Sequence, residues 1–118
     1  MRMEDRRDGD VLVVKPAEQA LDAYAAPAFR EQMAGFIQKG HRRIVLDLSL
    51  VSFLDSTGLG AIVSSLKRLD GDGVMVIAGA CEMVMDVFRL TRMDRVFPIV
   101  HTLDEGLTLA REYVRRAA

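Results

Sequence analysis

Short apolar runs rich in β-branched residues alternate along this chain with segments whose apolar residues recur at helical spacing. The runs that resemble strands cover residues 11–14, 43–48, 74–78 and 96–100. Strands that alternate with helices indicate an α/β domain with a largely parallel central sheet. Sheets of this kind place their working sites at the turns that lead from a strand into a helix.

Punctuating residues locate the helices between these runs. Pro27 suits the first turn of a helix, and Gly40 stands where a helix often ends in a left-handed residue. Further helices are predicted from Leu59 onwards, over residues 82–90, and after Thr102, which forms a capping-box pattern with Glu105 and precedes an apolar stripe that reaches Val114. Short extended pieces are expected near residues 18–21 and 51–53, and Pro98 suggests that the last strand lies at an edge.

Length limits the chain to one domain. It has 118 residues, 50% of them hydrophobic, which suffices for one modest core. Residues 1–9 are charged almost throughout, and we expect a flexible leader there, followed by the domain over residues 10–118.

The charge balance excludes several classes of function. With 16 basic and 17 acidic residues the formal net charge is −1, so nucleic acid is not an expected partner. No stretch approaches the ~20 apolar residues needed to cross a bilayer, so we expect a cytoplasmic protein without direct membrane insertion. Cys81, His41 and His101 lie far apart in sequence, which predicts neither a metal site nor a cofactor, and Cys81 is expected in the core.

One strand-to-helix junction contains a small polar cluster. Asp55, Ser56 and Thr57 follow an apolar run and precede Gly58 and Gly60. A hydroxyl in the first turn of a helix faces free backbone N–H groups, so the fold would tolerate a phosphate there. Glycines in a first turn favour close approach by another backbone, such as that of a docking partner. In a purely structural interpretation, Asp55 or Ser56 is only a helix cap.

An enzyme is not predicted. Ser56 lacks both a nearby base and a nucleophile-elbow motif, and the single Asp-Ser-Thr-Gly sequence has no second copy for paired-carboxylate chemistry. A phosphoaspartate receiver domain with Asp47 as acceptor is an alternative, but the acidic residues and the lysine of its magnesium site are missing. Asp47 is then a solvated or locally hydrogen-bonded carboxylate at a strand end.

Two segments together resemble the signature of STAS domains, specifically of bacterial anti-sigma factor antagonists. They are Ile44-Val45-Leu46-Asp47-Leu48 and Val51-Ser52-Phe53-Leu54-Asp55-Ser56-Thr57-Gly58-Leu59-Gly60. Leu21-Asp22 and residues 92–99 also look like segments of this family, so only the leader lies outside the resemblance. The expected fold is therefore one STAS-like α/β domain with a central mixed, largely parallel sheet of four to five strands and about four helices.

The resemblance implies a switch that regulates transcription. Its partner would be a cytoplasmic anti-sigma factor, a serine kinase of the histidine-kinase-like ATPase fold, and a serine phosphatase would reverse the modification. Ser56 is the implied phosphoacceptor, with Thr57 as the alternative, and phosphorylation would switch binding off. The partner-binding residues would be Asp22, Asp55, Ser56, Thr57, Gly58, Leu59 and Gly60.

The chain departs from the family pattern before Asp22, where Gln19-Ala20-Leu21-Asp22 replaces the common Gly-Glu-Leu-Asp. An alternative within the same fold is a regulatory STAS subunit of a transporter or of a signalling scaffold.

Overall fold

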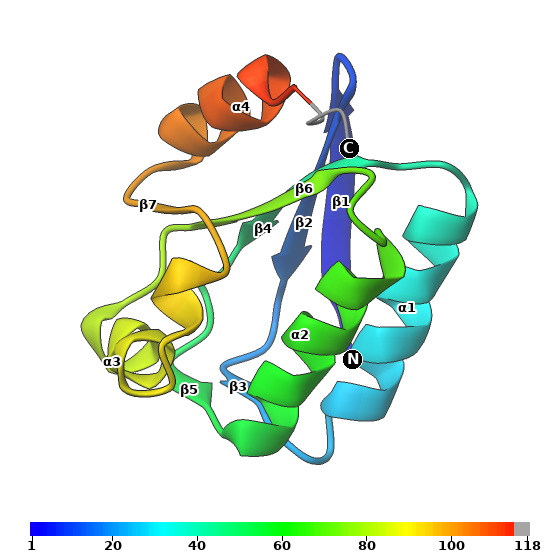
Figure 1. Ribbon diagram of the computed structural model, residues 1–118. Helices are drawn as coiled ribbons and strands as arrows, with labels where there is room; N and C mark the ends of the chain where they lie inside the picture. The colour runs from blue at the N-terminus through cyan, green and yellow to red at the C-terminus, as the bar shows by residue number, and fades with distance from the viewer. Residues whose placement is uncertain (115–118) are drawn as a thin grey trace.

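The computed structural model describes residues 1–114 and shows alternating strands and helices (Figure 1). The strands are β1 (Met3–Asp8), β2 (Val11–Pro16), β3 (Ala20–Leu21), β4 (Arg43–Asp47), β5 (Phe53–Leu54), β6 (Val74–Ala78) and β7 (Ile99–Val100). The helices are α1 (Ala26–Gln38), α2 (Ser56–Arg68), α3 (Glu82–Leu90) and α4 (Leu103–Glu112), with one 3₁₀ turn, η1 (Met93–Arg95). Within the described part, no helix has the length and apolar content to span a bilayer.

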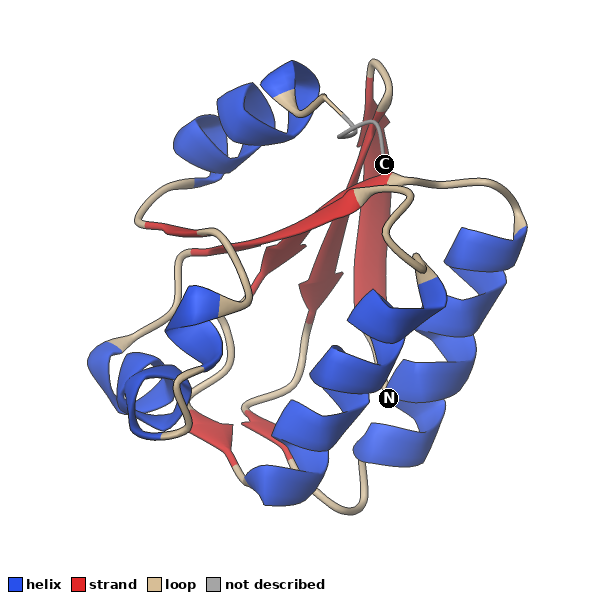
Figure 2. Ribbon diagram, in the orientation of Figure 1, coloured by secondary structure: helices blue, strands red, loops and turns tan. Residues whose placement is uncertain are grey.

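Five strands form the central sheet in the order β1-β2-β4-β6-β7. Strands β2, β4, β6 and β7 are parallel, and β1 pairs antiparallel with β2. This confirms the predicted mixed, largely parallel sheet, and β7 lies at an edge as Pro98 suggested. A second sheet of two short parallel strands, β3 and β5, stands beside the first turn of α2 (Figure 2).

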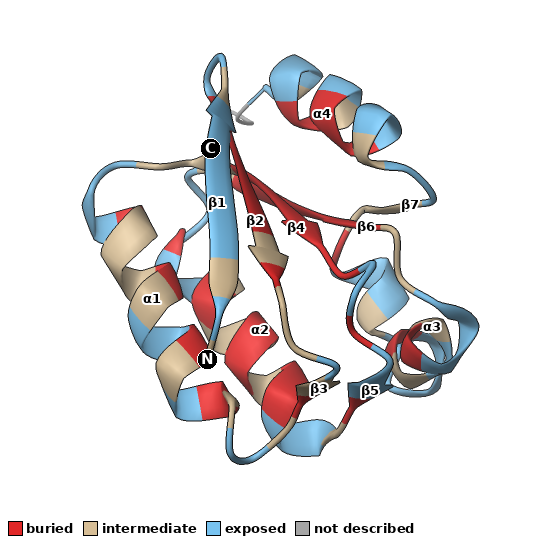
Figure 3. Ribbon diagram, turned by 180° about the vertical axis from the view of Figure 1, so that it is seen from behind, coloured by how far each residue is buried: buried red, intermediate tan, exposed pale blue. Residues whose placement is uncertain are grey.

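Alternation along the strands divides the core between the two faces of the sheet. Leu12, Ile44 and Ile77 belong to the larger apolar cluster, which also takes buried side chains from α1, α2 and α3. Val13 and Val45 belong to the smaller cluster, which α4 covers. Because β4 and β6 are covered on both faces, they read as continuous apolar runs in the sequence (Figure 3).

Several predicted boundaries hold. Strand β6 and helix α3 occupy the predicted residues, Pro27 lies in the first turn of α1, and Gly40 has a φ of 103° just after α1 ends. The hydroxyl of Thr102 accepts a hydrogen bond from the N–H of Glu105 at 3.1 Å and faces the Glu105 carboxylate at 3.0 Å. Glu105 therefore bonds the hydroxyl rather than the backbone of Thr102, and only half of the capping box forms.

The prediction of a flexible leader is wrong, because β1 pairs with β2 from Met3↔Pro16 to Asp8↔Val11. Residues 115–118 of the predicted domain lie outside the described residues. Two smaller expectations also fail. The last strand is only β7, and Val114 lies beyond α4 and is exposed. The short extended piece expected near residues 51–53 is found in part as β5, which begins at Phe53.

Cys81 is exposed at the start of α3, with its Sγ 3.7 Å from the carbonyl oxygen of Val51, and is not a core residue as predicted.

Candidate functional site

The predicted polar turn forms the junction between β5 and α2. Asp55 has extended backbone angles and is the N-cap, so α2 begins at Ser56 and not at Leu59. The Oδ1 of Asp55 accepts a hydrogen bond from the N–H of Gly58 at 2.8 Å, and its carbonyl accepts from the N–H of Leu59 at 2.9 Å. These two bonds fix the start of the helix.

Backbone approach within the chain explains one of the two glycines. A Cβ added at Gly58 would lie 2.0 Å from the carbonyl oxygen of Leu21, because the pairing of β3 with β5 brings that carbonyl under the first turn of α2. A Cβ at Gly60 would meet only the Arg30 side chain, at 3.8 Å. Gly58 thus lets α2 pack closely on β3. A glycine is required at this position by a contact within the protein and not by a docking partner.

Ser56 and Thr57 are exposed at this turn. Within residues 1–114 neither hydroxyl has a hydrogen-bond partner, and neither do the backbone N–H groups of these two residues. Free N–H groups at a helix start favour negative charge. A phosphoryl group on either hydroxyl would therefore enter solvent beside unpaired donors.

Asp22 holds the neighbouring turn that leads into α1. Its Oδ1 accepts hydrogen bonds from the N–H groups of Tyr24 at 3.0 Å and Ala25 at 3.1 Å. The turns that precede α1 and α2 lie at the same end of the molecule (Figure 1). Asp22 thus has a local structural role and is half-buried, so part of it remains open to solvent.

The predicted site residues differ in exposure. Ser56 and Thr57 are exposed, whereas Asp22, Asp55 and Gly60 are half-buried. Gly58 and Leu59 are buried, and Leu59 belongs to the larger apolar cluster. These two residues pack inside the protein beneath the exposed turn, so neither presents a side chain to a partner.

Sequence reasoning missed three side chains near this turn. Tyr24 is 96% exposed in the loop before α1, and Phe53 is 48% exposed on β5. The Arg30 guanidinium lies over α2 at Gly60, one turn after Ser56. An aromatic residue close to the turn residue Asp22 was the available signal for Tyr24, but Phe53 reads in the sequence as part of a buried run.

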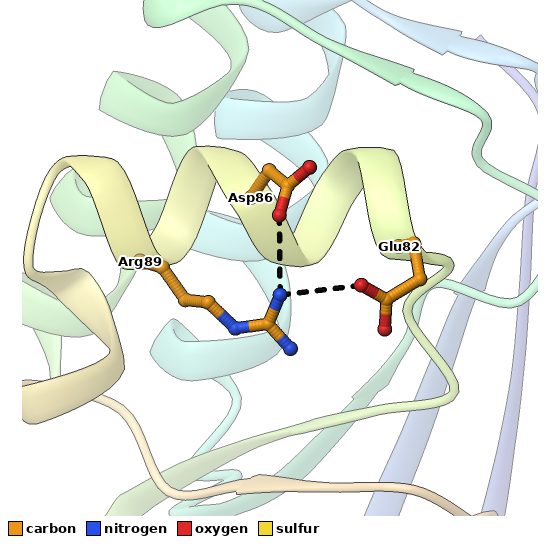
Figure 4. A network of polar contacts seen from close by, with 3 residues as sticks. All are labelled: Glu82, Asp86 and Arg89. Carbon is orange, nitrogen blue, oxygen red and sulfur yellow. Dashed lines mark hydrogen bonds and ion pairs between the residues drawn. The ribbon is translucent and has the colours of Figure 1, made fainter.

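A separate network of charges lies on α3 (Figure 4). The guanidinium of Arg89 donates to Glu82 at 3.3 Å and to Asp86 at 3.1 Å. These contacts, first with Glu82 and then with Asp86, raise the pKa of Arg89 further above its ordinary value. A raised pKa keeps the arginine charged until strongly alkaline pH, so this network provides no switch near neutrality.

Asp47, the acceptor in the receiver alternative, is 7% exposed. Its Oδ1 accepts a hydrogen bond from the N–H of Ser49 at 3.0 Å, so the carboxylate is locally bonded but not solvated as a whole. Within residues 1–114 no group of three His, Cys, Asp or Glu side chains could hold a metal ion. The receiver alternative therefore gains no support.

The fold and the turn define a class, a single α/β domain with an exposed serine at the start of a helix that follows a short strand. A sequence model of the family described as STAS domain matches residues 2–106, and the chain belongs to this family.

Its relatives include proteins named as anti-sigma factor antagonists. A Thermotoga maritima protein named as an anti-sigma factor antagonist is 35% identical over 109 residues, which cover 91% of this chain and 92% of that protein. The anti-sigma-B factor antagonist of Staphylococcus aureus is 38% identical over 72 residues, which cover 60% of this chain and 67% of that protein. Among solved structures, an anti-sigma factor antagonist from Mycobacterium paratuberculosis superposes with a TM-score of 0.87 at 26% identity, covering 94% of each chain.

Proposed function

We propose that this protein is a cytoplasmic anti-sigma factor antagonist, and that it regulates transcription by binding an anti-sigma factor. The partner is a serine kinase of the histidine-kinase-like ATPase fold, and it inactivates the antagonist by phosphorylating Ser56. A serine phosphatase restores the active form. The antagonist itself catalyses nothing.

The exposure of Ser56 on a fixed turn is the observation that carries this proposal. A kinase must bring the γ-phosphate of ATP to the acceptor oxygen, so the hydroxyl must be reachable and free of internal bonds. Ser56 meets both conditions. Thr57 meets them too and remains the alternative acceptor, but Ser56 directly follows the cap residue Asp55, which is the position that the family resemblance indicates.

Charge explains how phosphorylation switches binding off. A phosphoserine adds about −1.5 to −2 charges, which free N–H groups at the helix start accommodate without loss of the fold. At a closed interface the same charge lies beside Asp55, where repulsion and desolvation oppose docking. The proposed contact surface comprises the exposed or half-buried residues Asp22, Asp55, Ser56, Thr57 and Gly60, extended by Tyr24 and Phe53.

The test begins with copurification of the tagged protein from its own cells, followed by reconstitution with the kinase that is recovered. We expect ATP to add one phosphate, and peptide mass spectrometry to place it on Ser56. Thr57→Ala is the matched control and should be labelled like the wild type, whereas Ser56→Ala should not be labelled. Label on Thr57 or Asp47 would contradict the assignment, and recovery of a transporter ATPase in place of a kinase would favour a transporter role.

Calorimetry with the same kinase tests the switch. We expect Ser56→Ala to bind like the wild type and Ser56→Asp to bind at least about 10-fold more weakly, because a new negative charge faces the partner. Thermal unfolding is the control, since an acidic residue in the first turn of α2 should leave stability unchanged or slightly raised. Equal binding by both variants would refute the proposed switch.

A further inference from the structure

A small cavity lies on the α4 face of the sheet, at the carboxyl ends of β2 and β4. Its volume is about 200 Å³, and it is lined by Glu4, Asp5, Arg6, Val13, Lys15, Asp47 and Leu103. Helix α4 packs against β2, β4, β6 and β7, and the charged strand β1 lies at the sheet edge beyond β2 (Figure 3).

The buried carboxylate of Asp47 has one oxygen left for this cavity. Oδ1 accepts a hydrogen bond from the N–H of Ser49. Gly79 packs close to the same oxygen, since a Cβ added to this glycine would lie 3.2 Å from it. Oδ2 has no hydrogen bond within residues 1–114, and no fully buried side-chain nitrogen or oxygen there lacks a partner. Oδ2 is therefore reached by solvent, and it is an acceptor available to a ligand.

Lys15 lines the same cavity with the opposite charge. Val13 of β2 pairs with Val45 of β4 in register. Lys15 and Asp47 each lie two residues further along these parallel strands, so both side chains project from the same face of the sheet. Within the described residues Lys15 makes no ion pair of 4.0 Å or less, with Asp47 or with any other carboxylate. Arg6, on the same face, pairs at 3.7 Å with Asp8.

The lining of the cavity thus includes an acceptor, Asp47, and a cation, Lys15, that has no ion pair within the described residues, together with the apolar Val13 and Leu103. The charged β1 residues Glu4, Asp5 and Arg6 complete the lining. The cavity volume of about 200 Å³ lies below the roughly 300–1,000 Å³ of sites for drug-sized ligands, which suits a small molecule such as an amino acid. We propose that this cavity binds a small zwitterionic metabolite of the α-amino acid class. Its ammonium group donates to Oδ2 of Asp47, and its carboxylate accepts from Lys15.

The first experiment is an NMR titration of the ¹⁵N-labelled full chain with each common amino acid separately, up to about 10 mM, a concentration that reveals weak millimolar binding. We expect at least one amino acid to cause saturable shifts in the amides of Val13, Asp47 and Leu103. That amino acid is then compared with its amide, which lacks the carboxylate, and with its N-acetyl derivative, which lacks the ammonium group. Each derivative should bind at least about 10-fold more weakly, since each loses one charged contact.

Variants locate the binding. Lys15→Met keeps the apolar stem and should weaken binding about 10-fold, while Lys67→Met, at an exposed lysine on α2, should leave it unchanged. Asp47→Asn keeps an Oδ1 acceptor for Ser49 and should also weaken binding, with circular dichroism to confirm the fold. The proposal is overturned if no amino acid produces saturable shifts at these amides, if the derivatives bind as well as their parent, or if Lys15→Met and Lys67→Met behave alike.

Discussion

Two glycines on the same helix have different surroundings. Gly58 faces the carbonyl carbon and oxygen of Leu21 and the side chain of Leu54, whereas Gly60 has open space apart from the flexible end of Arg30. At Gly58 the absence of a side chain permits the contact between α2 and β3. At Gly60 glycine only lowers the helix propensity of α2.

Alanine substitutions at these positions should therefore act in opposite directions. Gly58→Ala forces β3 and α2 apart and should lower the free energy of unfolding by about 2–3 kcal/mol, the cost of overpacking a tight contact. Gly60→Ala should raise it by about 0.5–1 kcal/mol through helix propensity. Urea unfolding followed by circular dichroism measures both, and a Gly58→Ala variant as stable as Gly60→Ala would disprove the seating of α2 on Leu21.

At the scale of elements, β1 shows how a charged segment can be regular structure. Its sequence, MEDRRD, has charged side chains on both faces, yet it pairs with β2 along its whole length. Charges on an edge strand oppose pairing with other molecules. Strand β1 thus covers the edge of β2, in which residues 11–14 are all buried.

Removal of residues 1–9 should therefore change both the stability and the association state of the protein. We expect a lower urea midpoint and concentration-dependent association, because the apolar β2 becomes an unprotected edge. Chemical denaturation and size-exclusion chromatography at several concentrations measure these effects. The double variant Glu4→Gln, Arg7→Gln keeps the strand and serves as control; unchanged stability of the truncated chain would mean that β1 contributes nothing.

Local pattern accounts for the elements that were predicted well and for those that were not. Strand β6 and helix α3 could be read from the sequence because burial imposes apolar content at a fixed period. Strand β1 could not, because its stability comes from its partner β2 and not from its own apolar residues. The bounds of β5 could not be read from the sequence either, because its pairing partner is the short β3, a contact that no local pattern contains.

The same limit applies to the site. The position of the turn at Asp55 and Ser56 follows from cap chemistry and from the family resemblance, so the sequence located it. The burial of Leu59 and the approach of Leu21 to Gly58 depend on how separate elements pack. The exposure of Cys81 likewise reflects its place at the start of α3 and not its residue type.

At the scale of the whole molecule, Arg43 joins the start of β4 to the end of α4. Its Nη1 donates to the carbonyl oxygens of Ala110 and Tyr113, each at 2.6 Å, and its guanidinium carbon lies 6.0 Å from the centre of the Tyr113 ring. A cation at a helix C-terminus meets carbonyls that have no partner in the helix. Arg111, from the same helix, pairs with Asp8 of β1 at 2.6 Å.

Arg43→Met should loosen α4 from the sheet. We expect a loss of about 1–3 kcal/mol in unfolding free energy, because carbonyls bonded to a charged group lose their partner. Compared with the wild type, the variant should show a larger increase in hydrogen exchange at α4 amides than at β4 and β6 amides. Arg68→Met, at an exposed arginine in the last turn of α2, is the control, and equal protection in both variants would argue against this tether.

The first turn of α2 rests on Leu21 and is held at its start by Asp55, so we expect its backbone to keep the same conformation if Ser56 is phosphorylated. Under the proposed function, the partner would then distinguish the two forms mainly by electrostatic potential and not by a change of backbone shape. Discrimination of that sort fades as ionic strength rises, since mobile ions screen exposed charges within about 10 Å at 0.1 M salt. The salinity inside the cell would thereby set how sharply the two forms are told apart.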